Sequence, residues 1–91
     1  MIVVHLPRSL ADEFGAPTTL RLGPEADVAG VIARLDALYP GVRQRLTEVN
    51  GELRPHLSAF VGEADTRRRG GVHTDVPDGA DIWFFRAISG G

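Results

Sequence analysis

The chain has 91 residues, of which 43% are hydrophobic, and ten basic residues against twelve acidic ones give a net charge of −2. This length predicts one small domain, and the slight acidity argues against nucleic acids or anionic membranes as partners, because domains that bind them are usually basic. No apolar run approaches the roughly 18 residues of a membrane span, and the start lacks a signal-peptide pattern. We therefore expect a complete, cytoplasmic protein with no nucleic-acid or membrane partner.

The first half of the chain predicts a hairpin followed by one main helix. The β-branched run 2–6 and the alternating segment 18–22 predict two paired strands. Apolar residues then recur every three or four positions over 27–41, as on one face of a helix. Asp27 is a suitable N-cap, and Pro40-Gly41 ends the pattern. The apolar stripe consists of Val28, Val31, Ile32, Leu35 and Leu38.

The second half predicts two or three further strands. Asn50-Gly51 is typical of a tight hairpin turn. Residues 56–62 alternate as a strand, 63–76 predict a polar connector, 77–79 predict a turn, and 81–88 predict the last strand. Strands arranged around a single helix indicate an α+β fold, with four to five strands in one sheet and the helix on one face.

One helix covers only one face of such a sheet. In the last strand, Ile82 and Phe84 are expected in the core, while Phe60, Trp83 and Phe85 are expected on the uncovered face. That much exposed aromatic surface suggests a docking patch for another protein. The alternative is that one of the long connections folds over these rings.

The chain offers few groups for catalysis. Cysteine and lysine are absent, so there is no thiol chemistry, and the amine of Met1 is the only one that could be acylated. The absence of lysine also fits a GC-rich genome that favours arginine codons. His5, His56 and His73 lie far apart and predict no metal site. The RRRGG run at 67–71 lacks the strand-to-helix context of a phosphate loop. We interpret it as a solvated loop, or alternatively as a contact for an acidic partner. We do not expect this chain to be an enzyme on its own.

The last residues are the remaining candidate. Two terminal glycines contribute nothing to closing a fold, because glycine loses the most conformational freedom on ordering. The six residues beyond Phe85 extend up to roughly 20 Å, which is enough to thread a deep cleft. The α-carboxylate, with a pKa near ~3.5, is ionised and must be activated before it can react, most simply by adenylation. The chain has no ATP site of its own, so a partner enzyme is implied. The slender segment consists of Ala87, Ile88, Ser89, Gly90 and Gly91.

The segment VPDGADIWFFRAISGG (76–91) resembles the C-terminal signature of the MoaD/ThiS family of ubiquitin-like β-grasp sulfur carriers, which show a D-G-D-x-[VI] turn and strand before a terminal Gly-Gly. Residues 56–76 look most like the branch that includes CysO, the carrier of cysteine biosynthesis, and the helix over 27–41 is similar to the family's single amphipathic helix. Three departures leave the subfamily open. They are Gly62, Ala80 and Arg86.

The resemblance implies a β-grasp domain with a mixed sheet over 1–86 and a flexible tail over 87–91. It implies that a ThiF/MoeB-like enzyme adenylates Gly91 with ATP and that a sulfur donor converts the product to a thiocarboxylate. The sulfur would then pass to a synthase resembling cysteine synthase, thiazole synthase or the large subunit of molybdopterin synthase. In the CysO branch a metalloprotease later releases the product. The chain itself is expected to bind no cofactor or metal.

We assign partner binding to Phe60, Trp83, Phe85 and Arg86. Phe85 aligns with an exposed phenylalanine of the family, whereas Phe60 and Trp83 are added from the alternation of side chains along the strands. Other functions fit the same tail. A ubiquitin-like modifier would be joined to lysines of other proteins through Gly91, and a permanent subunit would resemble the small subunit of molybdopterin synthase. The remaining alternative is a structural domain with a diglycine end that arose by chance.

Overall fold

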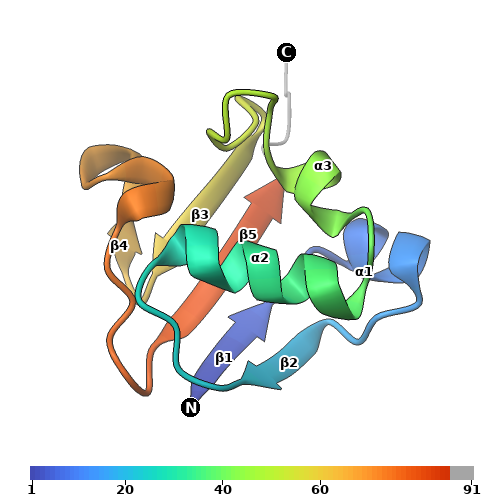
Figure 1. The fold of residues 1–91 in the computed structure, drawn as a ribbon, viewed down its shortest axis with the longest axis horizontal. Helices are drawn as coiled ribbons and strands as arrows, with labels where there is room; N and C mark the ends of the chain where they lie inside the picture. Colours follow the sequence, from blue (N-terminus) through green and yellow to red (C-terminus); the bar gives the residue numbers. More distant parts are fainter. Residues whose placement is uncertain (87–91) are drawn as a thin grey trace.

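The computed structural model describes residues 1–86, which form one mixed sheet with helices on one face (Figure 1). The strand order is β2-β1-β5-β3-β4. The strands are β1 (Ile2–His5), β2 (Thr19–Leu22), β3 (Leu57–Val61), β4 (Ala64–Asp65) and β5 (Asp81–Arg86). The helices are α1 (Arg8–Phe14), α2 (Val28–Leu38) and α3 (Val42–Leu46), with short 3-10 segments η1 (Thr66–Arg68) and η2 (Gly71–His73).

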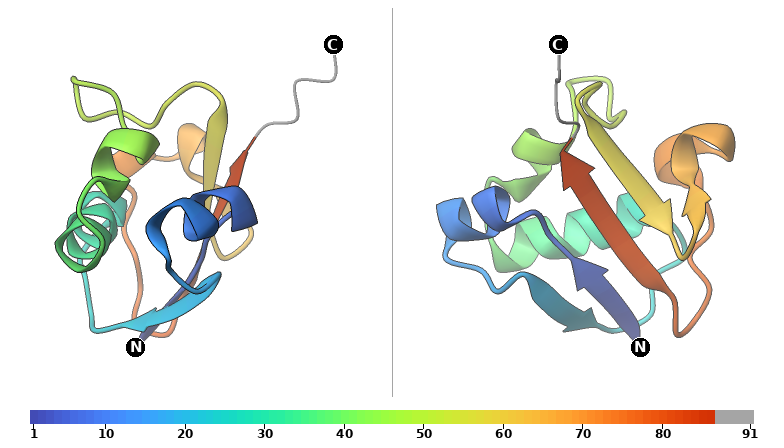
Figure 2. Two further views of the ribbon diagram at one scale, coloured as in Figure 1. Left: turned by 90° about the vertical axis from the view of Figure 1, so that its right-hand side faces the viewer. Right: turned by 180° about the vertical axis from the view of Figure 1, so that it is seen from behind.

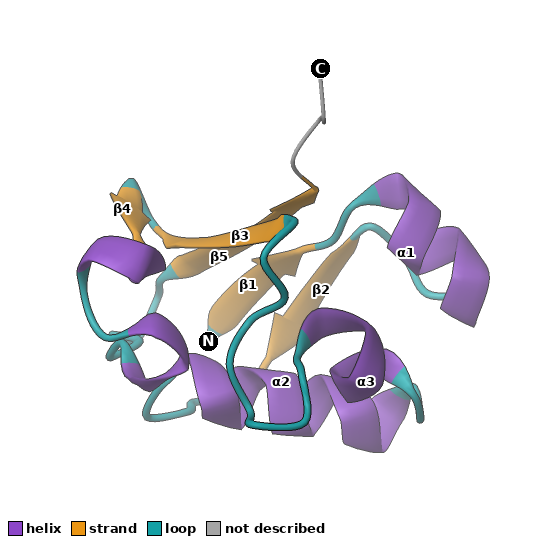
Figure 3. Cartoon of the chain, turned by 90° about the horizontal axis from the view of Figure 1, so that it is seen from above, coloured by secondary structure: helices purple, strands orange, loops and turns teal. Residues whose placement is uncertain are grey.

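Strand β5 lies at the centre of the sheet. It runs parallel to β1, with Val4 opposite Ile82, and antiparallel to β3, with Ala59 opposite Phe84. Strand β2 pairs antiparallel with β1 at one edge. Seen from above, α2 and α3 lie on one side of this sheet, and α1 lies beside its edge (Figure 3). The predicted α+β fold, with five strands and one main helix on one face, is confirmed.

The core lies between the sheet and α2. The apolar side chains on the covered face of β1 and β5 are almost completely excluded from solvent, with Phe84 only 2% exposed. Helix α2 starts as predicted, because the side chain of Asp27 accepts a hydrogen bond from the backbone of Gly30 at 2.8 Å. Four of the five stripe residues are buried. Leu38 is the exception, because it ends the helix and is 52% exposed.

Two helices were not predicted. Strands β1 and β2 pair as expected, but helix α1 lies between them and ends at Gly15, which adopts a φ of 64°. Helix α3 follows α2 directly after Gly41, whose φ of 105° suits glycine best. Both helices are short, so the repeat of apolar residues in each is too brief to give a helical pattern.

The connections in the second half are more structured than predicted. Around Asn50-Gly51 the chain makes the expected tight turn, but the pairing is limited to one isolated bridge between Thr47 and Leu53. The predicted polar connector 63–76 contains β4, η1 and η2, and it buries Val72 in the core. The predicted turn at 77–79 is present, with the backbone of Ala80 donating to the Pro77 carbonyl at 3.1 Å.

None of the helices within residues 1–86 is long and apolar enough to cross a membrane.

Candidate functional site

The uncovered face of the sheet carries a group of aromatic rings, which we call the aromatic patch: His5, Phe60, Trp83 and Phe85. Trp83 lies at the centre. Its ring is parallel to that of Phe85 at 5.8 Å, and it stacks on the imidazole of His5 at 3.6 Å and 8°. Phe60 meets Phe85 edge to face at 5.7 Å. The register of the sheet explains this arrangement, since β5 places Trp83 opposite both His5 on β1 and Phe60 on β3.

The aromatic patch is open to solvent. Trp83 is 38% exposed and Phe85 is 46% exposed, and the view from behind shows the strands of this face without a covering helix (Figure 2). The alternative that a long connection folds over these rings is therefore wrong. Together with Phe60, both rings also line a shallow hollow whose polar edge is Glu63. Phe60, Trp83 and Phe85 thus lie together where the sequence placed them.

His5 was missed as a member of this patch. Its Nε2 lies 3.1 Å from Oδ1 of Asp81, so the imidazole is held flat against the indole of Trp83. Nothing near His5 in the sequence indicates this contact, because it depends on the parallel pairing of β1 with β5. The position of His5 could have been predicted only if the pairing of β1 with β5 had been known.

Arg86 ends the described part of β5, opposite Leu57 at the start of β3. It lies at the rim of a hollow on the end of the sheet, and the predicted tail begins directly after it. The tail residues Ala87, Ile88, Ser89, Gly90 and Gly91 lie outside the described residues, so their roles remain predictions. The hollow is lined by Gln44, Arg45, Arg54, His56 and Arg86.

The arginine-rich loop is exposed, as the sequence suggested, but one of its arginines also makes several contacts with the domain. The guanidinium of Arg67 donates hydrogen bonds to the carbonyl oxygens of Arg54, Pro55 and Leu57, the one to Pro55 at 2.9 Å. It also donates to the hydroxyl of Ser58 at 3.3 Å. Arg67 therefore holds the segment that leads into β3, which lies next to the end of β5. Arg67 is thus exposed to solvent and hydrogen-bonded to the domain at the same time.

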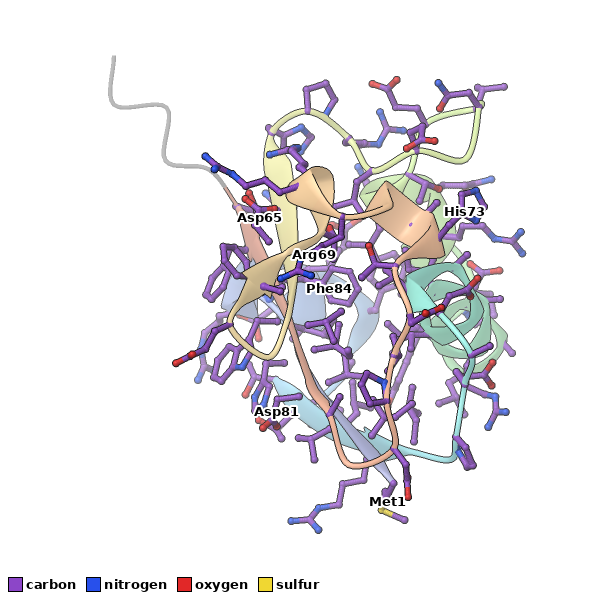
Figure 4. The ribbon with its side chains drawn as sticks, turned by 90° about the vertical axis from the view of Figure 1, so that its left-hand side faces the viewer. Met1, Asp65, Arg69, His73, Asp81 and Phe84 are labelled. Carbon is purple, nitrogen blue, oxygen red and sulfur yellow. The ribbon has the colours of Figure 1, made fainter. Side chains whose placement is uncertain are left out.

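A third hollow lies on the side of the molecule formed by the 3-10 segments (Figure 4). Arg69, His73 and Asp75 are among its lining residues, so it combines both signs of charge. Within residues 1–86 no group of three histidine, cysteine or acidic side chains is arranged to hold a metal ion.

Two carboxyl groups within residues 1–86 have a lowered pKa, and the hydrogen bonds that each one accepts explain the shift. A hydrogen bond from the N-terminal amine of Met1 at 2.7 Å, followed by the charge of that amine, lowers the pKa of Asp78. The backbone amides of Arg43 and Gly41 lower the pKa of Asp36, which caps the start of α3. Met1 and Asp81 lie toward the same end of the sheet (Figure 4). Arg86 ends β5 at the other end, because β1 and β5 are parallel.

The chain is similar along nearly its whole length to small carrier proteins. No family model matches it. The sulfur carrier protein CysO of Mycobacterium tuberculosis is 27% identical over 92 residues, which cover 99% of this chain and 98% of that protein. Small archaeal modifier protein 3 of Haloferax volcanii is 31% identical over 71 residues, covering 78% of this chain and 76% of that protein.

Solved structures agree with these matches. The CysO structure from M. tuberculosis has a TM-score of 0.88 and 26% identity over 97% of this chain and 100% of that one. The structure of the Amycolatopsis orientalis BexX/CysO complex matches with a TM-score of 0.90 and 24% identity, covering both chains completely. The fold is therefore the ubiquitin-like β-grasp that the sequence resemblance implied.

Proposed function

This chain belongs to the MoaD/ThiS-like family of ubiquitin-like sulfur carriers and modifiers, which includes CysO, and we propose that it carries sulfur as a thiocarboxylate on Gly91. The observation that carries the proposal is that one strand serves two purposes. Strand β5 presents Trp83 and Phe85 on the open face and leads directly into the tail. A protein that docks on these rings is thereby positioned to receive the chain end.

The first partner is a ThiF/MoeB-like enzyme that binds ATP. In its active site the carboxylate of Gly91 attacks the α-phosphorus of ATP, and pyrophosphate leaves, so that an acyl-adenylate forms. Hydrosulfide from a sulfur donor then attacks the acyl carbon, AMP leaves, and the thiocarboxylate remains. This chain contributes a long and narrow tail, since the six residues beyond Phe85 span up to roughly 20 Å.

The second partner is an enzyme that accepts the sulfur. Similarity to CysO over almost the full length favours a cysteine-synthase-like acceptor, with a metalloprotease that later releases the product from Gly91. A thiazole-synthase-like enzyme or the large subunit of molybdopterin synthase would use the same tail. That a CysO has been solved in complex with BexX supports a carrier that works by docking on another protein.

A second candidate function is protein modification through the same carboxylate. It is favoured by the similarity to small archaeal modifier protein 3. The chain has no lysine, so its side chains cannot be targets for building chains of itself. Peptide digests of cell lysate would distinguish this role, because conjugation leaves the last residues of this chain attached to lysines of other proteins.

Intact mass spectrometry tests the sulfur-carrier role directly. After incubation with the activating enzyme, ATP and a sulfur source, the mass should rise by about 16 Da, the difference between sulfur and oxygen. A variant with one residue added after Gly91, and Gly90→Val, should fold normally and gain no sulfur. Gain of sulfur by the extended variant without trimming would contradict the proposal.

A further inference from the structure

The end of the sheet where β5 stops concentrates positive charge. Its hollow is lined by three arginines, one histidine and a glutamine, and none of these lining residues is acidic. We call it the basic hollow. The chain as a whole has a net charge of −2, so this concentration is local rather than a consequence of composition. Three separate segments contribute to it: α3, the loop between α3 and β3, and the end of β5.

The central arginine is held in place before any partner binds. Arg54 is half-buried, and its guanidinium donates two hydrogen bonds to the carbonyl oxygen of Gln44, at 3.0 and 2.8 Å. A carbonyl oxygen fixes the geometry but leaves the full positive charge. By contrast, Arg45 is paired with Glu13 at 2.5 Å, so its charge is partly balanced. The field of the basic hollow therefore comes mainly from Arg54 and Arg86.

The position of the basic hollow links it to the tail. Side chains alternate along β5, so Arg86 points to the same side as the buried Phe84, whereas Phe85 points to the open face. Figure 1 shows α3 and the loop that precedes β3 beside this end of β5. The end of β5, where the tail begins, is thus flanked by aromatic rings on one face of the sheet and by positive charge on the other.

We propose that the basic hollow receives carboxylate side chains from the rim of the partner protein's cleft that takes up the tail. This inference rests on the proposed function, because it assumes that a partner engages the chain beyond Arg86. The rim of a cleft that encloses the tail must lie close to the end of β5 and therefore close to the basic hollow. Complementary charge at such a rim raises the association rate more than it raises affinity, and it orients the tail toward the opening.

Charge reversal tests the basic hollow with the activating enzyme as the probe. The variants are Arg86→Glu and Arg54→Glu, and the matched control is Arg21→Glu, which is exposed on β2 at the far edge of the sheet. At ~50 mM salt, where screening is weak, both hollow variants should associate with the enzyme about tenfold more slowly than the control. At ~500 mM salt the three rates should converge, because the Debye length falls below about 5 Å.

Two results would overturn this proposal. One is that Arg86→Glu, which leaves the Arg54 hydrogen bonds in place, associates as fast as Arg21→Glu. The other is that inorganic phosphate below about 1 mM, at constant ionic strength, displaces the enzyme, because that affinity would make the basic hollow a site for a small anion. Thermal melts of each variant establish that it is folded.

The same measurements separate this inference from the proposed function. If wild-type protein binds the enzyme with the expected salt dependence but never gains sulfur, the sulfur-carrier role fails and the basic hollow stands. If wild-type protein gains sulfur and both hollow variants behave as the control does, the basic hollow fails and the carrier role stands.

Discussion

The two faces of β5 are built from similar residues, but one face is buried in the core and the other is exposed. On the covered face, Ile82 and Phe84 are 0% and 2% exposed, whereas on the open face Trp83 and Phe85 are 38% and 46% exposed. All four are large and apolar, so hydrophobicity alone does not decide which face carries the core. The position of α2 decides it, because this helix covers one face only.

This difference teaches that one strand can hold the domain together and present it to a partner at the same time. Substitutions on the covered face should change the free energy of unfolding. Substitutions on the open face should leave that quantity nearly unchanged and should alter binding instead.

The largest effect is expected from Phe84→Ala. Removal of a fully buried aromatic ring destabilises a protein by about 3–5 kcal/mol, through lost transfer free energy and the cavity that remains. A domain of this size has a total stability of only about 5–15 kcal/mol, so the variant should be marginally folded. Urea denaturation measures the change. A loss below about 1 kcal/mol would mean that the covered face is not the core.

A smaller loss is expected from Arg67→Met, which keeps the length of the aliphatic stem and removes the guanidinium. The carbonyl oxygens of Pro55 and Leu57 and the hydroxyl of Ser58 then lose their donor, at a cost of about 0.5–1.5 kcal/mol, because water can reach most of these acceptors. The neighbouring Arg68→Met is the matched control, since both arginines are exposed in the same 3-10 segment. Equal urea midpoints for the two variants would show that Arg67 does not hold the start of β3.

Phe85→Ala should give the opposite pattern. Its ring is half exposed, so the free energy of unfolding should fall by no more than about 1 kcal/mol. Affinity for the activating enzyme should fall at least about tenfold, as is typical for an aromatic anchor at the centre of an interface. Calorimetric titration measures the affinity. Met1→Ala, which truncates another exposed apolar side chain at the far end of the sheet, is the control and should bind normally.

Local sequence patterns predicted those elements in which a regular spacing of residues or a turn sequence can be recognised. The stripe on α2, the alternation in β3 and β5, and the turn at 77–79 are of this kind, and they sufficed for the fold class and for the exposed rings. Helix α1 was missed because only Leu10 and Ala11 are buried in its seven residues. A pattern of two apolar positions does not distinguish a short helix from a loop.

The parts of the site that sequence reasoning missed depend on contacts between distant segments. His5 reaches the aromatic patch only because β1 runs parallel to β5, and the two strands lie more than seventy residues apart along the chain. The basic hollow brings together Arg54, His56 and Arg86 with residues of α3. Neither arrangement leaves a local signal, because each is set by the way the sheet and helices pack.

The smallest expected effect concerns the end of the sheet opposite the tail, where Met1 and Asp78 form an exposed ion pair. The amine lowers the pKa of Asp78 in the folded state, so this pair contributes stability above the pKa of an unfolded aspartate, near ~3.9, and loses it as pH falls below that value. Asp78→Asn should therefore melt slightly below wild type at pH 7 and equally at pH 2. Thermal melts across this range measure the difference. A gap that persists at pH 2 would mean that the carboxyl group acts through its shape rather than its charge, and that this end of the sheet, unlike the basic hollow, owes nothing to electrostatics.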